Sequence, residues 1–215
     1  LYTAQPSEVA RLGRKFREML DRHGYGKAES ILDEWNYLKG WTDEFPYTCR
    51  MISDTKGAAF AAAALSLGQT APIDMLMYYD ARPGTVFNGL FDLYTLKPRP
   101  AYYAFLAWSW LRDLGTQVSA SVTGAPSGET VVATAAQKDG RTGVLVTRYT
   151  DDDNRVSPET VRIALPKGAS GDIVRGFVTD GFHAGAAKTF LPESDGSLIL
   201  SMLPNSFVYL EVGVR

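Results

Sequence analysis

The sequence predicts an α/β fold followed by an all-β fold, within a chain of 215 residues. Before residue 115, helical patterns alternate with two short apolar runs, an order that is typical of parallel strands connected by helices. After Gly115, short runs of alternating or β-branched residues recur at spacings of about 10 residues, with turn residues between them. We therefore expect two domains, residues 1–115 and residues 116–215, and the second should be a β-sandwich.

The composition is that of a globular protein with a sizeable core. The chain is 45% hydrophobic, and its 22 basic and 24 acidic residues give a net charge of -2. This balance lacks the basic footprint of nucleic-acid-binding proteins, and no apolar run approaches the roughly 18 residues of a membrane span. We expect neither nucleic acid nor a membrane among the partners.

Cys49 is the only cysteine, so an internal disulfide is excluded. Because secreted enzymes of bacterial type also often lack disulfides, the cysteine count leaves periplasmic, secreted and cytoplasmic locations open. The chain starts with Leu1-Tyr2-Thr3, without a methionine or a signal peptide. We expect it to belong to a longer polypeptide.

Three helices are predicted in the first domain. Residues 6–22 have apolar residues at helical spacing, and residues 55–67 are rich in alanine, the best helix former. Residues 101–114 carry apolar and aromatic side chains nearly all round, which indicates a buried helix.

The first strand is predicted within the stretch 30–37, Ser-Ile-Leu-Asp-Glu-Trp-Asn-Tyr, which runs from apolar residues to a pair of acids. Strict alternation would place Leu32 with Glu34 on one face and Asp33 with Trp35 on the other. If the strand belongs to a barrel of alternating strands and helices, Glu34 lies at the carboxyl end, where catalytic groups sit.

The second strand is predicted over residues 73–79, Ile-Asp-Met-Leu-Met-Tyr-Tyr. Alternation puts Tyr79 on the face of Met75 and Met77 and Tyr78 on the other face, and the sequence leaves open which face is the inner one. Two parallel strands alone would leave edges and apolar faces uncovered, whereas a (β/α)8 barrel needs eight strands and about 250 residues. Residues 1–115 are therefore predicted to form the last two βα units of an incomplete TIM barrel.

Seven strands are predicted in the second domain, and Asp139-Gly140 marks a hairpin turn between two of them. The predicted strands are Gln117–Val122, Thr130–Gln137, Gly143–Tyr149, Thr160–Leu165, Asp172–Val178, Ser197–Met202 and Phe207–Val212.

Several motifs follow one another in an order that resembles clan A glycoside hydrolases. Glu34-Trp35-Asn36 ends a strand, an alanine-rich helix follows, and Gly89-Leu90-Phe91-Asp92 precedes Lys97-Pro98-Arg99-Pro100-Ala101-Tyr102-Tyr103. In this order the whole chain resembles the seventh and eighth βα units of these enzymes and their C-terminal β-sandwich. It is most similar to family 39, which contains β-xylosidases and α-L-iduronidases.

The resemblance implies the C-terminal portion of a retaining glycosidase, which hydrolyses glycosidic bonds. The nucleophile of the clan is the carboxylate at the end of the seventh strand, and Glu34 matches it. The acid/base of the clan is a Glu after Asn at the end of the fourth strand, and no segment here matches it. We therefore expect the chain alone to be inactive, with a carbohydrate substrate and the N-terminal part of the barrel, covalent or as a separate chain, as partners. No cofactor is expected.

Four residues are predicted to bind the substrate: Trp35, Asn36, Trp41 and Tyr79. Loops at the strand ends of barrels build pockets, and aromatic faces suit sugar rings. Three of them also have a plainer interpretation, in which Trp41 plugs its loop, Asn36 forms a turn and Tyr79 packs in the wall.

The two acids of the first strand are interpreted differently. The plainer interpretation of Glu34 is a solvated acid in a turn, and the order of motifs favours catalysis. Asp33 stands where the family often has Thr or Ser, and we interpret it as a structural hydrogen-bond acceptor.

No metal site is predicted. The run Asp151-Asp152-Asp153-Asn154 lacks the Gly and the distant Glu of a calcium loop, so a solvated hairpin is favoured. His23 and His183 fall in separate domains and have no partners at metal-ligand spacing.

A second hypothesis is a non-catalytic carbohydrate-binding or interaction module built on the β-sandwich. It requires a row of exposed aromatic residues on one face of the sandwich. The aromatic residues available are Tyr149, Phe177, Phe182, Phe190, Phe207 and Tyr209. Most of them alternate as core residues do, which disfavours this hypothesis.

Overall fold

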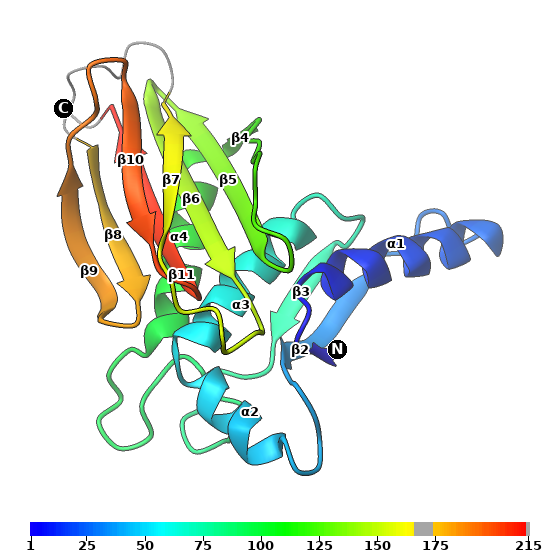
Figure 1. Ribbon diagram of the computed structural model, residues 1–215. Helices are drawn as coiled ribbons and strands as arrows, with labels where there is room; N and C mark the ends of the chain where they lie inside the picture. Colours follow the sequence, from blue (N-terminus) through cyan, green and yellow to red (C-terminus); the bar gives the residue numbers. More distant parts are fainter. Residues whose placement is uncertain (166–173, 214–215) are drawn as a thin grey trace. The chain divides into compact units, whose positions relative to one another are not determined.

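The computed structural model describes residues 1–165 and 174–213, which form two compact units (Figure 1). The first unit is Leu1–Tyr102 and the second is Tyr103–Arg215. The division falls inside the helix α4 (Pro100–Leu114), earlier than the predicted division at residue 115, because side chains of this helix pack on the sheet of the second unit.

The first unit contains a parallel sheet of three strands in the order β1-β2-β3. The strands are β1 (Tyr2–Thr3), β2 (Ile31–Tyr37) and β3 (Met75–Tyr78), and the helices are α1 (Ser7–Arg22), α2 (Phe45–Ile52) and α3 (Thr55–Gly68). The sequence predicted two strands, and β1 is an addition to them. Because β1 has only two residues, its sequence is too short to show a strand period, and only the pairing with β2 reveals the strand.

The helix α3 forms the core of the first unit. Its alanines from Ala58 to Ala64 are fully buried, and Phe60 packs among them. Gly57 lets the helix approach α2 closely, because a Cβ at this position would lie 2.6 Å from the carbonyl oxygen of Met51. The small side chains that favoured a helix in the sequence therefore also set its packing distance.

A β-bulge in β2 corrects the predicted alternation of its side chains. Leu32 pairs with Leu76 and Trp35 pairs with Tyr78, so two residues of β2 lie opposite one residue of β3. Because Leu76 and Tyr78 are two residues apart, they share a face, and Leu32 and Trp35 share it too. Strict alternation, which separated Leu32 from Trp35, was therefore wrong.

The face of the sheet opposite to this one is apolar and partly uncovered. Ile31 and Met75, which pair with each other, are 48% and 46% exposed, and Met77 is 44% exposed. Leu76 points the other way, toward α3, where its side chain would meet a Cβ placed on Gly68. The helices therefore cover one face of the sheet and leave the other free.

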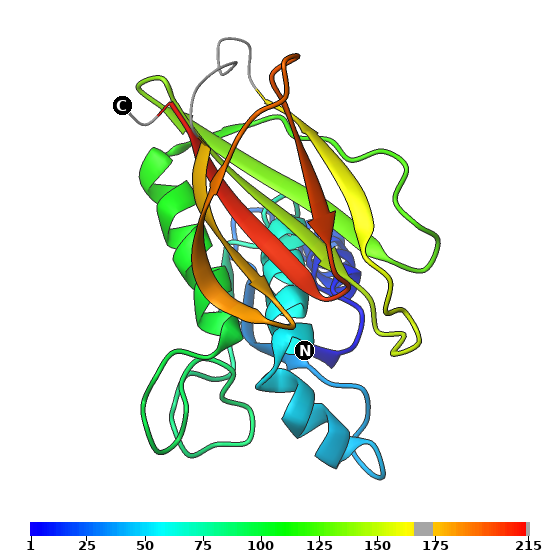
Figure 2. The same ribbon diagram turned by 60° about the vertical axis from the view of Figure 1, so that its left-hand side comes forward.

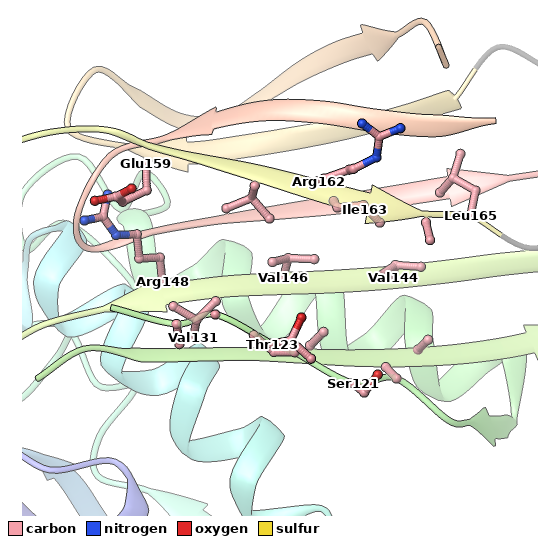
Figure 3. Close-up of a pocket in the computed structure, with 18 of the residues that line it drawn as sticks. Ser121, Thr123, Val131, Val144, Val146, Arg148, Glu159, Arg162, Ile163 and Leu165 are labelled. Carbon is pink, nitrogen blue, oxygen red and sulfur yellow. The ribbon is translucent and has the colours of Figure 1, made fainter. Parts of the chain in front are cut away.

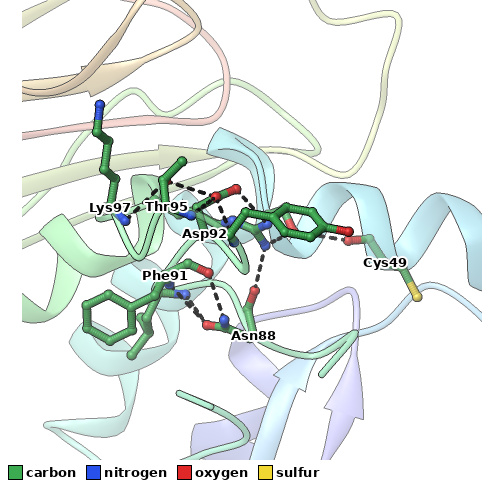
Figure 4. Close-up of polar contacts among 10 residues, drawn as sticks. Cys49, Asn88, Phe91, Asp92, Thr95 and Lys97 are labelled. Carbon is green, nitrogen blue, oxygen red and sulfur yellow. Dashed lines mark hydrogen bonds and ion pairs between the residues drawn. The ribbon is translucent and has the colours of Figure 1, made fainter. Parts of the chain in front are cut away.

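The segment between β3 and α4 is held by its own polar groups (Figure 4). The Asn88 side chain accepts hydrogen bonds from the backbone of Leu90 and Phe91 and donates one to the Phe91 carbonyl. Arg99 donates to the Ser53 hydroxyl and to the Asn88 carbonyl. The motif residues of this segment thus have a structural role.

Gly89 and Asp92 of this segment are each required by a specific contact. A Cβ on Gly89 would lie 2.5 Å from the Tyr78 hydroxyl and 2.7 Å from the Ile52 carbonyl oxygen. The Asp92 carboxylate accepts hydrogen bonds from the backbone and hydroxyl of Thr95 and from the backbone of Tyr94. These donors stabilise the charged form of the carboxylate.

The second unit is a β-sandwich of unequal sheets. A six-stranded antiparallel sheet has the order β4-β5-β6-β11-β8-β9, and β10 pairs with β7 in a two-stranded antiparallel sheet. The strands are β4 (Thr116–Val118), β5 (Thr130–Lys138), β6 (Arg141–Tyr149), β7 (Glu159–Ala164), β8 (Val174–Asp180), β9 (His183–Phe190), β10 (Ser197–Met202) and β11 (Ser206–Val212).

Two features of this unit differ in how well the sequence predicted them. The hairpin at Asp139-Gly140 is confirmed, since both residues have positive φ and β5 pairs with β6 up to Lys138 and Arg141. The strand β9 was missed, because its sequence His-Ala-Gly-Ala-Ala-Lys-Thr-Phe has few β-branched residues. Residues 166–173, which include the start of one predicted strand, lie outside the described residues.

The larger sheet has an apolar core on each face. The helix α4 lies along one face of this sheet (Figure 2). Trp110 of α4 lies 5.1 Å from the Tyr209 ring and 5.5 Å from the Phe177 ring. On the other face, Val208 and Leu210 of β11 pack with Leu198 of β10. Alternate residues of β11 thus serve the two cores, which is the alternation expected of a central strand.

We predict that the pKa of Asp92 is near 2, well below its ordinary value of 3.8, because the Thr95 backbone and hydroxyl donate to its carboxylate. The folded protein then binds this proton less readily than the unfolded chain, so the carboxylate stabilises the fold above pH 3.8 and loses this effect as the pH falls toward 2. Urea unfolding of the wild type and Asp92→Asn should show a stability difference at pH 6 that shrinks near pH 2.

The control for this prediction is Thr95→Val, which removes the hydroxyl donor and keeps the backbone donors. The pKa of Asp92, measured by NMR, should rise only part of the way toward 3.8 in this variant. An equal stability difference at both pH values would contradict the assignment.

Candidate functional site

Glu34 lies on β2 with its carboxylate exposed and bound by a tyrosine. The Tyr2 hydroxyl donates to Glu34 Oε2 at 3.0 Å. The contact exists because β1 pairs with β2 in parallel, with Tyr2 opposite Asn36. In residues 1–165 and 174–213, no lysine or arginine side chain forms an ion pair with Glu34. The tyrosine hydroxyl therefore holds the carboxylate in place.

The hydrogen bond also affects Tyr2. The pKa of the Tyr2 hydroxyl is raised, first by desolvation and then by its hydrogen bond to Glu34. The raised pKa keeps the Tyr2 hydroxyl protonated, which is the form that can donate a hydrogen bond to the Glu34 carboxylate.

Trp35 points away from this carboxylate and into the core. Its side chain is 1% exposed, and its ring lies 5.3 Å from the Tyr78 ring and 6.4 Å from the Phe60 ring. Burial on the helix-covered face does not support direct contact of Trp35 with a substrate. Its position supports a packing role that holds the end of β2 on α3.

Asn36 is buried and connects β2 to the end of β3. Its side-chain amide donates to the carbonyls of Tyr79 at 2.6 Å and Phe87 at 2.9 Å, and its oxygen accepts from the Tyr37 backbone. These bonds occupy the amide, so Asn36 is placed to position the strand ends. Tyr79 also continues the pairing beyond β3, since its backbone N–H donates to the Trp35 carbonyl.

An aromatic cluster lies beside the Tyr2–Glu34 pair. The Trp41 ring is stacked on Phe45 at 5.8 Å and meets the Tyr2 ring edge-on at 5.4 Å. Phe87 lies 5.5 Å from the Tyr2 ring and 5.7 Å from the Tyr79 ring. The structure thus brings together the sequence-predicted Glu34, Trp41 and Tyr79 through two residues that sequence analysis missed, Tyr2 and Phe87.

Trp41 is the most accessible member of this cluster. Its side chain is 59% exposed, although it also packs on Phe45. Trp41 therefore packs against its loop and still leaves surface exposed. Substrate binding by Trp41 stays a prediction. The faces of β3 are also resolved, since Tyr78 packs on Trp35 while Tyr79 joins the cluster.

A fixed arginine lies next to Tyr79. Asp80, which is 6% exposed, accepts hydrogen bonds from the backbone and guanidinium of Arg82 and from the Thr85 hydroxyl. Arg82 also donates to the Tyr79 hydroxyl at 3.3 Å. The loop after β3 therefore presents an oriented guanidinium at the margin of the aromatic cluster.

The other polar groups singled out in the sequence have local roles. Asp152 accepts hydrogen bonds from the backbone and side chain of Asn154, as in a solvated turn, and its pKa is lowered by these bonds. His183 bonds to Asp180 in the β8–β9 turn. Burial raises the pKa of the Cys49 thiol, which disfavours the reactive thiolate. Within the described part of the chain, no group of three metal-ligating side chains is found.

The comparison with solved structures gives matches across nearly the whole chain. A glucosidase from Croceicoccus marinus matches with a TM-score of 0.72 and 18% identity, over 100% of this chain and 52% of that one. The family 39 enzyme from Xanthomonas axonopodis pv. citri matches with a TM-score of 0.65 and 13% identity, over 96% and 49%. A monomeric β-xylosidase from Caulobacter crescentus matches with a TM-score of 0.64 and 14% identity, over 97% and 50%.

The fold is that of clan A glycoside hydrolases, over about half their length. The predicted resemblance is confirmed at this level, and enzymes of families 30 and 44 are further structural neighbours. No protein-family model matches the sequence, and the comparison with curated proteins finds no match. None of the helices among the described residues has the length and apolar character needed to cross a membrane.

We predict that replacing Glu34 with Gln lowers the pKa of the Tyr2 hydroxyl but leaves it above its ordinary value of 10. The substitution removes the negative charge and weakens the hydrogen bond, whereas the desolvation of Tyr2, the larger cause, remains. NMR titration of the Tyr2 ring carbon, assigned with Tyr2→Phe, measures this change. Asp33→Asn is the control and should shift this pKa less. An unchanged pKa in Glu34→Gln would show that the two groups do not interact in solution.

Proposed function

We propose that the chain is the C-terminal portion of a retaining glycoside hydrolase of β-xylosidase type, in which Glu34 is the nucleophile. In this proposal β2 and β3 are the seventh and eighth strands of a (β/α)8 barrel, and β1 belongs to the sixth. The observation that carries it is the position of Glu34, exposed on β2, bound by Tyr2 and flanked by aromatic rings.

The uncovered face of the parallel sheet supports the barrel part of the proposal. Ile31, Met75 and Met77 form an apolar surface on the face away from the helices. Inward-facing apolar side chains fill the interior of a TIM barrel, so this surface is what the remaining strands would cover. The length of the structural neighbours, about twice the matched part, agrees with such a missing portion.

The chemistry follows from the requirements of a double displacement. The Glu34 carboxylate attacks the anomeric carbon while the bond to the leaving group breaks, and a glycosyl ester forms. A second carboxyl group about 5–5.5 Å away protonates the leaving oxygen and later takes a proton from water, which then cleaves the ester. We assign this second group to the part of the barrel outside residues 1–215.

Tyr2 and the aromatic cluster have distinct roles in this proposal. The Tyr2 hydroxyl orients Glu34 by donating a hydrogen bond to its carboxylate. The exposed Trp41 and the ring of Tyr79 provide apolar surface for the C–H groups of a sugar. In this proposal Trp35 and Asn36 do not contact the sugar. Trp35 positions the strand end by packing, and Asn36 does so by hydrogen bonds to the Tyr79 and Phe87 carbonyls.

The alternative function, a carbohydrate-binding module on the sandwich, has less support. Of the six aromatic residues that could form a binding row, five are buried, and only Phe182 is exposed, at 83%. A single ring at the turn between β8 and β9 does not make a row that could follow a polysaccharide.

We predict that the chain alone does not hydrolyse aryl β-xylosides, because it supplies the nucleophile without the acid/base. Release of the aryl group, followed by absorbance, should not exceed the rate in buffer. Appreciable turnover by residues 1–215 would contradict the assignment of the acid/base to another part of the polypeptide.

In the complete polypeptide, Glu34→Ala should lower kcat by about 10³-fold or more, because the nucleophile acts in both chemical steps. Azide, a small anion that can take the place of the lost carboxylate, should restore part of the rate and yield a glycosyl azide. The matched control is Asp33→Asn, which removes the neighbouring carboxylate and should keep most of the activity. A normal rate in Glu34→Ala, or equal losses in both variants, would remove Glu34 from this role.

A further inference from the structure

Phe87 lies at the centre of the aromatic cluster and belongs to the loop after β3. Four other rings surround its ring, with centroid separations of 5.5 Å to Tyr2, 6.2 Å to Trp41, 6.0 Å to Phe45 and 5.7 Å to Tyr79. All four separations are in the range of favourable aromatic pairs. Phe87 therefore joins side chains from β1, from the segment between β2 and α3, and from the end of β3.

The backbone of Phe87 is fixed separately from its ring. Its carbonyl oxygen accepts hydrogen bonds from the Asn36 side-chain amide at 2.9 Å and from the Asp80 N–H at 3.2 Å. The Thr85 hydroxyl donates to the Asp80 carboxylate at 2.7 Å, and the Asn88 N–H donates to the Thr85 carbonyl. None of these bonds uses the phenyl ring, so the loop keeps its path when the ring is shortened.

The ring of Phe87 packs on Tyr2, whose backbone is paired over a short distance. β1 consists of Tyr2 and Thr3, which each pair with one residue of β2. This pairing fixes the backbone of Tyr2 and leaves its side-chain torsions to be set by packing. The Phe87 and Trp41 rings, at 5.5 Å and 5.4 Å, supply this packing. They also exclude water from the Tyr2 ring, which agrees with desolvation as the first cause of its raised pKa.

We propose that Phe87 is a positioning residue, whose ring holds the Tyr2 hydroxyl against the Glu34 carboxylate. The hydroxyl lies 3.0 Å from Glu34 Oε2, and a rotation of the Tyr2 side chain would lengthen this hydrogen bond beyond its working range. A hydrocarbon ring has no polar group that could bind a carboxylate, so the effect of Phe87 on Glu34 passes through Tyr2. The consequence for catalysis rests on the proposed function, whereas the effect on Tyr2 does not.

Two other roles of a half-buried ring at this place lead to different expectations. A ring that contacts the sugar equally in the ground state and the transition state would affect KM and leave kcat unchanged. A ring that only fills space would affect stability and leave the hydrogen bond of Tyr2 as it is. Only the positioning role links Phe87 to both the Tyr2 hydroxyl and kcat.

The first test is the pKa of the Tyr2 hydroxyl in the complete polypeptide, measured by NMR titration of its ring carbon. In Phe87→Ala this pKa should fall toward its ordinary value of 10, because water reaches the Tyr2 ring. Phe87→Leu keeps apolar cover over the ring and should keep the pKa raised. An unchanged pKa in Phe87→Ala would overturn the proposal.

Tyr94→Ala is the matched control. Tyr94 belongs to the same loop and is 89% exposed, and its backbone N–H, which donates to Asp92, is retained in the variant. Removal of this ring should change neither the pKa of Tyr2 nor kcat. A shift of the Tyr2 pKa in this variant as large as in Phe87→Ala would show that the effect is not specific to Phe87 and would overturn the proposal.

The second test is a double-mutant cycle on the activity of the complete polypeptide. Phe87→Ala should lower kcat about tenfold, since a misplaced catalytic group lowers the rate without loss of substrate binding. In the Tyr2→Phe background the same substitution should lower kcat less than about threefold, because residues that act through one another are not additive. An equal loss of kcat in both backgrounds, or a raised KM with normal kcat, would overturn the proposal.

Further variants keep the tests decisive. If Phe87→Ala does not fold, Phe87→Val takes its place in both tests, with the same direction expected for the pKa of Tyr2 and for kcat. If Glu34→Ala keeps a normal rate, the proposed function fails, and the Tyr2 pKa should still respond to Phe87→Ala. The two failures are therefore distinguishable.

Discussion

The β-bulge in β2 determines where the functional side chains of the first unit point. With two residues of β2 opposite one residue of β3, Leu32 and Trp35 both face the helices. Glu34 then faces the open side of the sheet, where the Tyr2 hydroxyl reaches it. Bulges next to active sites redirect side chains in this way. A single inserted residue therefore places Leu32 on the same face as Trp35 instead of on the face of Glu34.

The groups around Glu34 are held by a second layer of contacts that are mainly structural. Asn36 binds the carbonyls of Tyr79 and Phe87, which keeps the end of β3 and the following loop beside β2. Asp80 fixes Arg82 in the same loop. Trp41 packs on Phe45, and Tyr79 packs on Phe87. These contacts fix the positions of both rings while part of their surface remains accessible. Preorganisation of this kind is what the catalytic role proposed for Glu34 requires.

The two units leave unsatisfied surfaces of different chemical character. The first unit has an uncovered apolar sheet face around Met75 and Met77. In the second unit, no strand among residues 103–165 and 174–213 pairs with the outer edge of β7, which lies beside an apolar groove (Figure 3). In the proposed function, further strands of a barrel cover the apolar face.

The sequence by itself determined the elements that have strong local signals. The alanine run predicted α3, Asp139-Gly140 predicted the hairpin, and the order of motifs from Glu34 to Tyr103 predicted the resemblance that the structural neighbours confirm. Periodicity, turn chemistry and motif order are local properties, so they can be read without coordinates.

Only the tertiary structure decided the features that depend on pairing between distant residues. β1 is too short to show a pattern, β9 lacks β-branched residues, and the bulge in β2 exists only relative to β3. The bond from Tyr2 to Glu34 joins residues 32 positions apart. Strand register and side-chain direction are set by the partner strand, and a partner strand is a property of the folded chain.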